Sequence, residues 1–386
     1  MLYLSRSPED AYCPFQGISP PFPPWHDATP GVCSFNLTIL DTLRGLHKAC
    51  ESGFFDFAKF NIEEYEHYEQ VENGDLNWTL ANKFIAFAGP HATRESHPGG
   101  YTSLCPEDYV SYFKRRNVKL VVRLNKKYYD ARKFTQHGIA HMELYFLDGS
   151  NPPDHLLAKF LEAVENIDGA VAVHCKAGLG RTGCVVGSYM MKHYRCTAEE
   201  VIGWLRICRP GSIIGPQQQW MKEVQSRMWR EGDLMRSKRG NGDAGKPDLV
   251  ANAKLSPQAG HAARGAAVKD SSVDRISSRM QGMQVSERRE AMQNTLTVGG
   301  RAQATGGADA RSLAAAAAAE EENKSQGDYL RQRRMLAAHE LASGGAKTGK
   351  VNYNDEKESG AGPAARGSGS GESGRIAKFL NSFVAK

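Results

Sequence analysis

The chain from Trp78 to about Arg230 alternates between short apolar runs and amphipathic stretches. KFIAFAGP, VKLVVRLN, IAHMELYFLD and GAVAVHC have the length of strands, whereas PEDYVSYFKRRN, HLLAKFLEAVENI and AEEVIGWLRICRP carry apolar residues at helical spacing. Strands joined by helices are typical of a mostly parallel sheet, whose functional loops gather at the carboxyl ends of the strands. We therefore expect an α/β fold, with a last helix from Pro216 to about Arg230.

The first 75 residues have a different pattern. Residues 1–35 are rich in proline and aromatic residues, which predicts a packed irregular segment, and NLTILDTLRGLHKAC then has apolar positions at helical spacing. The stretch FNIEEYEHYEQVENG predicts a second helix that ends at Asn73-Gly74, with Glu63, Glu66 and Glu69 on one face.

Beyond Glu231 the composition shifts to Gly, Ala, Ser and charged residues, and only four aromatic residues follow Met235. Such a stretch cannot bury enough apolar surface to offset chain entropy, so we expect residues 234–386 to form a disordered low-complexity tail. Its end, residues 374–386, places apolar side chains on one helical stripe. That stripe is either a helix that binds a partner protein or a membrane surface, or a frayed end.

Charge and cysteine content narrow the class of protein. The net charge of +6 (49 Lys and Arg against 43 Asp and Glu) arises in the tail, where a solvated linker is the favoured interpretation over nucleic-acid binding. The eight cysteines form no CxxC pair and have no metal-ligand spacing, so we expect reduced thiols, no metal and no cofactor. No run of about eighteen apolar residues predicts a transmembrane segment, and we expect a soluble, intracellular protein.

The strongest chemical signal is the segment HCKAGLGRTG, which follows the strand-like AVAV and precedes a helical pattern. A loop between a strand and a helix N-terminus directs backbone N–H groups at one point, which makes an anion site. We call residues 175–181 the phosphate loop. Its predicted phosphate-binding residues are Lys176, Ala177, Gly178, Leu179, Gly180 and Arg181.

The same loop predicts a nucleophile. Backbone dipoles and the Arg181 guanidinium should lower the pKa of Cys175 from about 8.5, and the thiolate can attack phosphorus to form a phosphocysteine. Arg181 would pair bidentately with two phosphate oxygens. Thr182 is expected to donate to the sulfur, and His174 to orient the loop backbone. The bare spacing of a cysteine and an arginine is also compatible with a buried structural cysteine.

Cleavage of a phosphoester also requires an acid that protonates the leaving oxygen. Asp148 follows the apolar run HMELYFL and should lie at the same edge of the sheet. From the residues alone, a structural turn at Asp148-Gly149 is the favoured interpretation, because Asp-Gly is a common turn pair.

At HCKAGLGRTG the chain resembles the cell-division-cycle phosphatases of the "fourteen" type, a branch of the dual-specificity phosphatases. RPGSIIGPQQQ, VVRLNKKYYDARKF, FLDGS, ENGDLNW and NLTILD are similar to that family as well, so the resemblance covers roughly residues 1–233. It implies tandem cysteine-phosphatase-like domains: a partial, non-catalytic first domain with a linker helix over 1–75, and a catalytic domain over 76–233. An incomplete first domain should expose apolar surface.

The resemblance also implies roles for further residues. It puts the acid at Asp148, a groove for a basic substrate residue at Glu66, Glu69 and Asp75, and a water-positioning role at Gln217 and Gln218. Without it, the acidic residues predict a solvated helix face, and the glutamines the solvent-facing start of a helix after Pro216.

The expected function is hydrolysis of phosphoserine, and of phosphothreonine and phosphotyrosine, in proteins phosphorylated by cyclin-dependent kinases. The resemblance implies phosphoserine-proline sites followed by a basic residue, a role in the cell cycle, and a location in nucleus, nucleolus and cytoplasm, with centrosome and spindle as further places. Two alternatives remain open. A phosphoinositide phosphatase would carry a second lysine where Leu179 stands, and a phosphopeptide-binding scaffold without catalysis would act through the tail.

Overall fold

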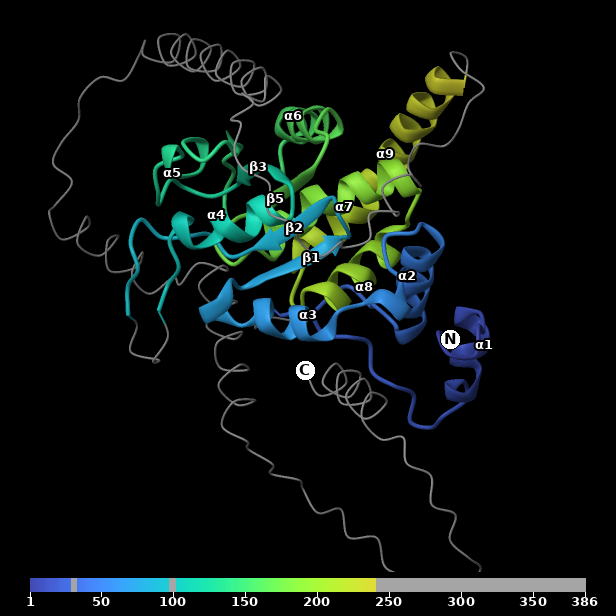
Figure 1. Ribbon diagram of the computed structural model, residues 1–386. Helices are drawn as coiled ribbons and strands as arrows, with labels where there is room; N and C mark the ends of the chain where they lie inside the picture. Colours follow the sequence, from blue (N-terminus) through green and yellow to red (C-terminus); the bar gives the residue numbers. More distant parts are fainter. Residues whose placement is uncertain (29–32, 97–101, 241–386) are drawn as a thin grey trace, which may run out of the picture. The chain divides into compact units, whose positions relative to one another are not determined.

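A computed structural model describes residues 1–28, 33–96 and 102–240 (Figure 1). The first part of the described chain is helical, with these elements: α1 (Pro8–Tyr12), η1 (Cys13–Phe15), α2 (Ile39–Glu51), η2 (Phe57–Lys59), α3 (Ile62–Glu69) and η3 (Val71–Asn73). Strands and helices then alternate: β1 (Leu76–Leu80), β2 (Phe84–Phe87), α4 (Pro106–Arg115), β3 (Val118–Arg123), α5 (Arg132–Thr135), β4 (Ala140–Glu143), α6 (Asp154–Glu165), β5 (Ala170–His174), α7 (Gly180–Tyr194), α8 (Ala198–Cys208) and α9 (Pro216–Gly240).

The five strands form one sheet in the order β1-β2-β5-β3-β4. β2, β5, β3 and β4 are parallel, and only β1 runs antiparallel, to β2. The expected α/β fold with a mostly parallel sheet is confirmed. Because β5 is the central strand, the residue that follows it emerges in the middle of the carboxyl edge.

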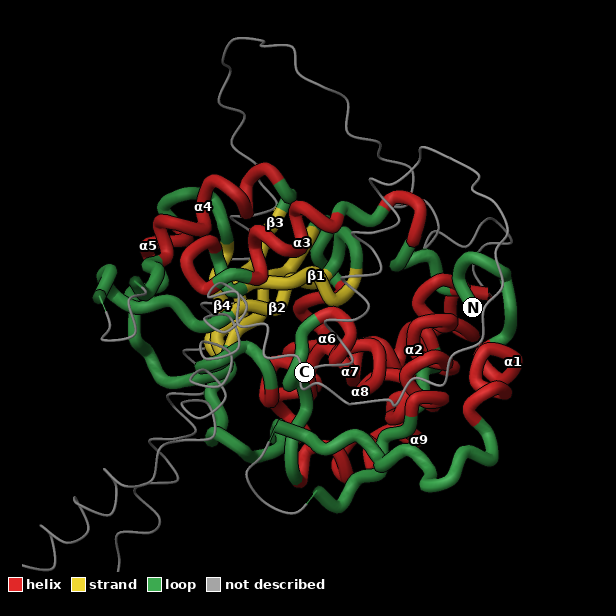
Figure 2. The backbone as a smooth tube through the Cα atoms, turned by 90° about the horizontal axis from the view of Figure 1, so that it is seen from below, coloured by secondary structure: helices red, strands yellow, loops and turns green. Residues whose placement is uncertain are grey.

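Two helical layers cover the sheet, and Figures 1 and 2 show α3, α4 and α5 on one face and α6, α7, α8 and α9 on the other. Alternate strand residues point to the two layers, as the period of two along a strand requires. On the first face Ile85, Val121 and Ala172 pack with α4 and α5, and on the second Phe84, Val122 and Val173 pack with α6 to α9.

α2 packs against α8 at very short distance. A Cβ atom on Gly45 would lie 2.4 Å from the Glu200 carbonyl oxygen, and one on Gly203 would lie 2.8 Å from the Thr42 Cα. Phe35, Leu37, Ala49 and Phe54 therefore share a hydrophobic core with the second helical layer. The domain boundary at residues 75/76 remains a prediction.

Several large apolar side chains of the first sixty residues are exposed. They are Tyr3, Leu4, Phe15, Ile18, Phe22, Trp25, Ile39 and Phe60.

α9 is longer than predicted, and residues 234–240, which we expected in the disordered tail, are helical. The helix continues because it packs along α7: a Cβ on Gly232 would lie 1.9 Å from the Lys192 carbonyl oxygen, to which Arg236 donates at 3.1 Å. The rest of the predicted tail, including the stripe at 374–386, lies outside the described residues. Over the described part, no helix combines the length and apolar character needed to cross a bilayer.

Candidate active site

The phosphate loop joins β5 to α7 at the carboxyl edge of the sheet. Val171, Ala172 and Val173 bury both faces of the strand, and the loop begins directly after His174. Gly178 has φ of +70°, and a Cβ there would lie 2.1 Å from the Phe87 carbonyl oxygen. A side chain at Gly178 would therefore push the loop off β2. The predicted order of strand, loop and helix is confirmed.

Cys175 is buried at the start of this loop, with 3% of its surface exposed. Burial by itself raises the pKa of the thiol, but the Arg181 charge and the donors of Thr182 outweigh burial, so the pKa lies below its ordinary value. Apart from this interaction with the sulfur, the buried Thr182 hydroxyl has no hydrogen-bond partner among the described residues. It is therefore available to donate to the sulfur once the sulfur is an anion.

Arg181 lies in the first turn of α7 and is 3% exposed. Its Nη1 donates to the Phe146 carbonyl at 3.0 Å, and its Nη2 lies 3.1 Å from Asp148 Oδ1. Among the described residues, Nε has no hydrogen-bond partner. A buried, unpartnered guanidinium N–H beside a low-pKa thiol is the place where a phosphate oxygen would bind.

Asp148 lies in the loop that follows β4 and is one-quarter exposed. Its ion pair with Arg181 and its influence on the pKa of Cys175 bring the three predicted catalytic residues together. Asp148 thus lies beside Arg181 and close enough to Cys175 to act on its charge, although it precedes Cys175 by 27 positions in the chain.

His174 is fully buried and supports the loop from within. Its Nδ1 lies 2.9 Å from the Cys175 carbonyl oxygen, and its Nε2 lies 2.7 Å from the Tyr129 hydroxyl, which also bonds His141 at 2.9 Å. Burial raises the pKa of Tyr129 and lowers that of His141, so both are neutral. A carbonyl only accepts, so His174 carries its proton on Nδ1 and accepts from Tyr129. The structure supports the predicted role of His174 in orienting the loop backbone.

Gln217 and Gln218, at the start of α9, are buried rather than solvent-facing. Gln217 Nε2 donates to the Ser150 carbonyl at 3.1 Å, and a Cβ on Gly180 would lie 2.7 Å from Gln217 Oε1. Gln217 therefore links the phosphate loop to the loop that follows β4 and carries Asp148 and Ser150, which we call the acid loop. Gln218 donates to Asp27 and accepts from Arg206, so its amide is already engaged. A water-positioning role stays a prediction for both.

The three predicted groove residues do not lie together on one surface. Glu66 is exposed and Glu69 is half-buried on α3, as a contact to a substrate residue requires. Asp75 is 4% exposed and pairs with Arg209 Nη2 at 2.9 Å, and its part in the groove stays a prediction. Its left-handed φ of +45° after Gly74 turns the carboxylate inward, a turn that side-chain periodicity does not reveal.

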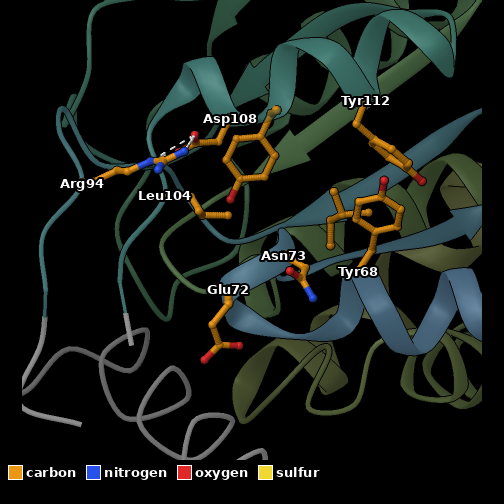
Figure 3. Close-up of a pocket in the computed structure, with 9 residues that line it drawn as sticks. Tyr68, Glu72, Asn73, Arg94, Leu104, Asp108 and Tyr112 are labelled. Carbon is orange, nitrogen blue, oxygen red and sulfur yellow. Dashed lines mark hydrogen bonds and ion pairs between the residues drawn. The ribbon is translucent and has the colours of Figure 1, made fainter. Parts of the chain in front are cut away.

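A hollow of about 240 Å³ opens between α3, η3 and α4 (Figure 3). It is lined by Tyr68, Glu72, Asn73, Leu76, Arg94, Leu104, Asp108, Tyr109 and Tyr112. Arg94 and Asp108 form an ion pair at its edge, and the ring centroids of Tyr68 and Tyr112 are 4.2 Å apart. None of the predicted site residues lines it.

The sequence reasoning missed residues that hold the loop from other elements. Tyr129 and Gly89 are far from the loop in sequence, yet Tyr129 bonds His174 and the Gly89 amide donates to the Lys176 carbonyl at 2.9 Å. The signal for Gly89 was its place after β2, because a glycine at a strand end allows close backbone approach. Tyr129 lies in an irregular segment that gave no periodic signal.

Two family models match the chain. The model described as "Dual specificity phosphatase, catalytic domain" matches residues 114–227, and the one described as "Dual specificity protein phosphatase, N-terminal half" matches residues 1–49.

Curated relatives match over a longer stretch. The mouse dual specificity protein phosphatase CDC14A is 54% identical over 239 residues, which are 62% of this chain and 40% of the mouse protein. The Caenorhabditis elegans tyrosine-protein phosphatase cdc-14 is 48% identical over 59% of this chain and 32% of its own length. The Schizosaccharomyces pombe tyrosine-protein phosphatase CDC14 homolog is 42% identical over 57% of this chain and 42% of its own length. The chain thus spans less than half the length of each of these relatives.

Proposed function

Because the chain belongs to the CDC14 type of dual specificity phosphatases, we propose that it hydrolyses phosphate monoesters on serine, threonine and tyrosine of proteins. Cys175 is the nucleophile, Arg181 the phosphate clamp and Asp148 the acid. The observation that carries the proposal is the pairing of a buried thiol of lowered pKa with a buried guanidinium whose Nε has no partner among the described residues.

In the first step, the Cys175 thiolate attacks phosphorus, the sulfur–phosphorus bond forms and the ester P–O bond breaks. The proton of Asp148 goes to the departing oxygen, which leaves as an alcohol. The Nη1 group of Arg181 keeps its hydrogen bond to the Phe146 carbonyl. Its Nε and Nη2 groups bind two phosphate oxygens. Nη2 exchanges its Asp148 partner for the phosphate in this step.

In the second step, water attacks the phosphocysteine and the sulfur–phosphorus bond breaks. The Asp148 carboxylate takes a proton from the water, and inorganic phosphate leaves. Thr182 stabilises the departing thiolate through its otherwise unpartnered hydroxyl. Gln217 is proposed to help position the water, since it lies between Gly180 of the phosphate loop and Ser150 of the acid loop.

The proposed substrates are phosphoserine-proline sites followed by a basic residue, as cyclin-dependent kinases produce them. Glu66 and Glu69 support this preference because both carboxylates lie at the surface of α3, where they attract a cationic side chain. A role in the cell cycle and a location in nucleus, nucleolus and cytoplasm belong to the same proposal. Fluorescence microscopy of the tagged chain tests the location.

The phosphoinositide alternative has less support from the site. Leu179 is 1% exposed and packs with Ile214, so position 179 offers no charge to a second phosphate group. The scaffold alternative has less support as well, because Arg181 pairs with Asp148 and the charge of Arg181 lowers the pKa of Cys175.

Phosphate release from a panel of substrates tests the function. The purified chain is assayed on phosphoserine-proline peptides with and without a downstream lysine, on phosphoserine-alanine, phosphothreonine and phosphotyrosine peptides, and on a soluble phosphatidylinositol phosphate. Release should be fastest from the phosphoserine-proline peptide with lysine and absent with Cys175→Ser. Faster release from the lipid would overturn the substrate class. Peptide binding without any release would favour the scaffold.

A further inference from the structure

Arg209 is a fully buried arginine that neither the catalytic steps nor the groove uses. It follows α8 directly and has 0% of its surface exposed. Its guanidinium donates to four acceptors: the Gly178 carbonyl at 2.9 Å, the Ala177 carbonyl at 2.8 Å, Asp75 Oδ1 at 2.9 Å and Asn77 Oδ1 at 2.6 Å. Two of these acceptors are backbone atoms of the phosphate loop.

The other carbonyls of the loop are also held from behind. The Cys175 carbonyl bonds His174 Nδ1, the Lys176 carbonyl accepts from the Gly89 amide, and the Leu179 carbonyl accepts from the Gly183 amide of α7. Every carbonyl from Cys175 to Leu179 therefore has a partner, and Arg209 alone supplies two of the five.

Because the peptide group is planar, the contacts that fix the loop carbonyls also fix the direction of the loop amides. In a trans peptide, the carbonyl of one residue and the N–H of the next point in opposite directions. Fixing the carbonyls of Ala177 and Gly178 on Arg209 turns the amides of Gly178 and Leu179 away from it. These are two of the amides that an anion in the loop would need.

The charge of Arg209 adds to this geometric effect. A cation that binds a carbonyl polarises the whole peptide group, so the N–H on the far side becomes a stronger donor. Asp75 is 4% exposed and compensates the buried charge, while Asn77 attaches the guanidinium to β1. The pair therefore supports the loop without exposing a free charge to it.

From this accounting we infer that Arg209 is a positioning residue of the phosphate site. It holds the amides of Gly178 and Leu179 toward the bound phosphate and the Cys175 thiolate, and Asp75 keeps it in place. The inference rests on the proposed function for its reaction, but its central prediction concerns anion binding.

Arg209→Lys is the first variant. A single ammonium group cannot reproduce a planar fork that reaches four acceptors, so the two amides lose their fixed direction. Loss of a donor that stabilises developing charge typically costs about a hundredfold or more in rate. In Arg209→Lys the amides of Gly178 and Leu179 are loosened rather than removed. We therefore expect inhibition by inorganic phosphate to weaken about tenfold and kcat to fall by about ten- to a hundredfold. The pKa of Cys175, from the pH dependence of its alkylation, should rise.

Arg206→Lys is the matched control. Arg206 is also a buried arginine of α8 that donates to backbone carbonyls, but to those of Ser212 and Ile213, outside the phosphate loop. The Arg206→Lys variant should lower the melting temperature and leave both the inhibition by phosphate and the pKa of Cys175 unchanged. A purely structural role of Arg209 would make the two variants alike in all three measurements.

A double variant separates positioning from folding. Arg209→Met alone leaves Asp75 buried without its charge partner and is expected to destabilise the fold. Arg209→Met with Asp75→Asn removes both charges and should restore the melting temperature while phosphate inhibition stays weak. Wild-type phosphate inhibition and thiol reactivity in the folded double variant, or in Arg209→Lys, would overturn the inference.

The readouts do not depend on the proposed substrates. If the wild-type chain released no phosphate from any phosphopeptide, the proposed function would fail. Binding of inorganic phosphate, measured by calorimetry, and the alkylation profile of Cys175 would still show whether Arg209 positions the loop.

Discussion

At the scale of the residue, Cys175 and Cys184 show how strongly the surroundings of a thiol set its chemistry. Both are buried, and burial raises the pKa of each thiol. Only Cys175 has a guanidinium and the donors of Thr182 beside it, and its pKa is lowered instead. Cys175 stands in the loop between β5 and the N-terminus of α7. This placement is a local feature, which is why the sequence alone indicated Cys175 as a reactive thiol.

Arg181→Ala should therefore raise the pKa of Cys175, because burial is then opposed only by Thr182. The group is a thiol whose folded pKa is lowered, so the thiolate forms at lower pH in the native chain than in a free cysteine. Iodoacetamide alkylation, followed by mass spectrometry between pH 5 and about 9, checks this. An unchanged profile would show that Arg181 does not activate the sulfur.

Asp148→Ala should slow turnover according to the leaving group. General acid catalysis contributes about a hundredfold or more for a poor leaving group such as serine, and little for a nitrophenolate. The kcat for a phosphoserine peptide should fall by about 10² while that for para-nitrophenyl phosphate falls far less. Equal losses on both substrates would exclude Asp148 as the acid. Asp154→Ala serves as a control, because Asp154 lies on α6 and is largely exposed.

At the scale of the element, prediction worked where an element carries its own signal. The run AVAVHC followed by glycines and a helical pattern was sufficient to place β5, the phosphate loop and α7. α9 was predicted too short, because its last turns depend on packing against Lys192 of α7 rather than on their own apolar residues. The burial of Asp75 was not predicted for a similar reason: its partner Arg209 lies 134 residues away.

Reversing the charge of α3 tests the groove. Glu66→Lys with Glu69→Lys should raise KM for peptides with a downstream lysine by up to about thirtyfold, since each surface ion pair contributes up to about 1 kcal/mol and the two contributions add. The kcat should change little. Glu223→Lys on α9 is the control, because Glu223 is exposed on a different element. Equal KM changes for peptides with and without the lysine would leave α3 as a solvated helix.

The attachment of α6 to α7 predicts a pH dependence of stability. Burial raises the pKa of Glu165, but its bonds to His193 at 2.9 Å and Lys192 at 2.7 Å lower it further, and the net direction is down. A carboxyl of lowered folded pKa contributes stability above its ordinary value of 4.5, and this contribution is lost as pH falls through the folded pKa.

Glu165→Gln should accordingly cost about 1–2 kcal/mol of unfolding free energy at pH 7 and progressively less below about pH 4.5. Urea unfolding at several pH values measures it. If the difference in unfolding free energy between Glu165→Gln and the wild type did not shrink in acid, then the shape of the Glu165 side chain, and not its charge, would contribute the stability.

At the scale of the whole molecule, Asp27 attaches the amino-terminal segment to the start of α9. It is 4% exposed, and its Oδ2 accepts from the Gly215 amide at 2.7 Å and from Gln218 Nε2 at 2.6 Å. Ala28 packs with Ala177, Leu179 and Ile214, so the same segment touches the phosphate loop. A contact that spans 188 residues has no signature in local sequence.

Asp27→Ala should destabilise the chain by about 3 kcal/mol, because it removes the carboxylate that accepts from the Gly215 amide and from Gln218 Nε2 and that faces the charge of Arg206. Chemical denaturation measures the loss, and Asp10→Ala on exposed α1 is the control. A loss equal to that of the control would mean that the amino-terminal segment is held by apolar packing alone.

The central place of β5 has a consequence for amide hydrogen exchange. Two strands lie on each side of this strand, so its N–H groups are released only when the sheet itself opens. We therefore expect the slowest amide exchange in the strand that leads to Cys175, whereas Asp148 follows β4 at the border of the sheet. Local opening of this border should impair proton delivery by Asp148 before it changes the surroundings of Cys175.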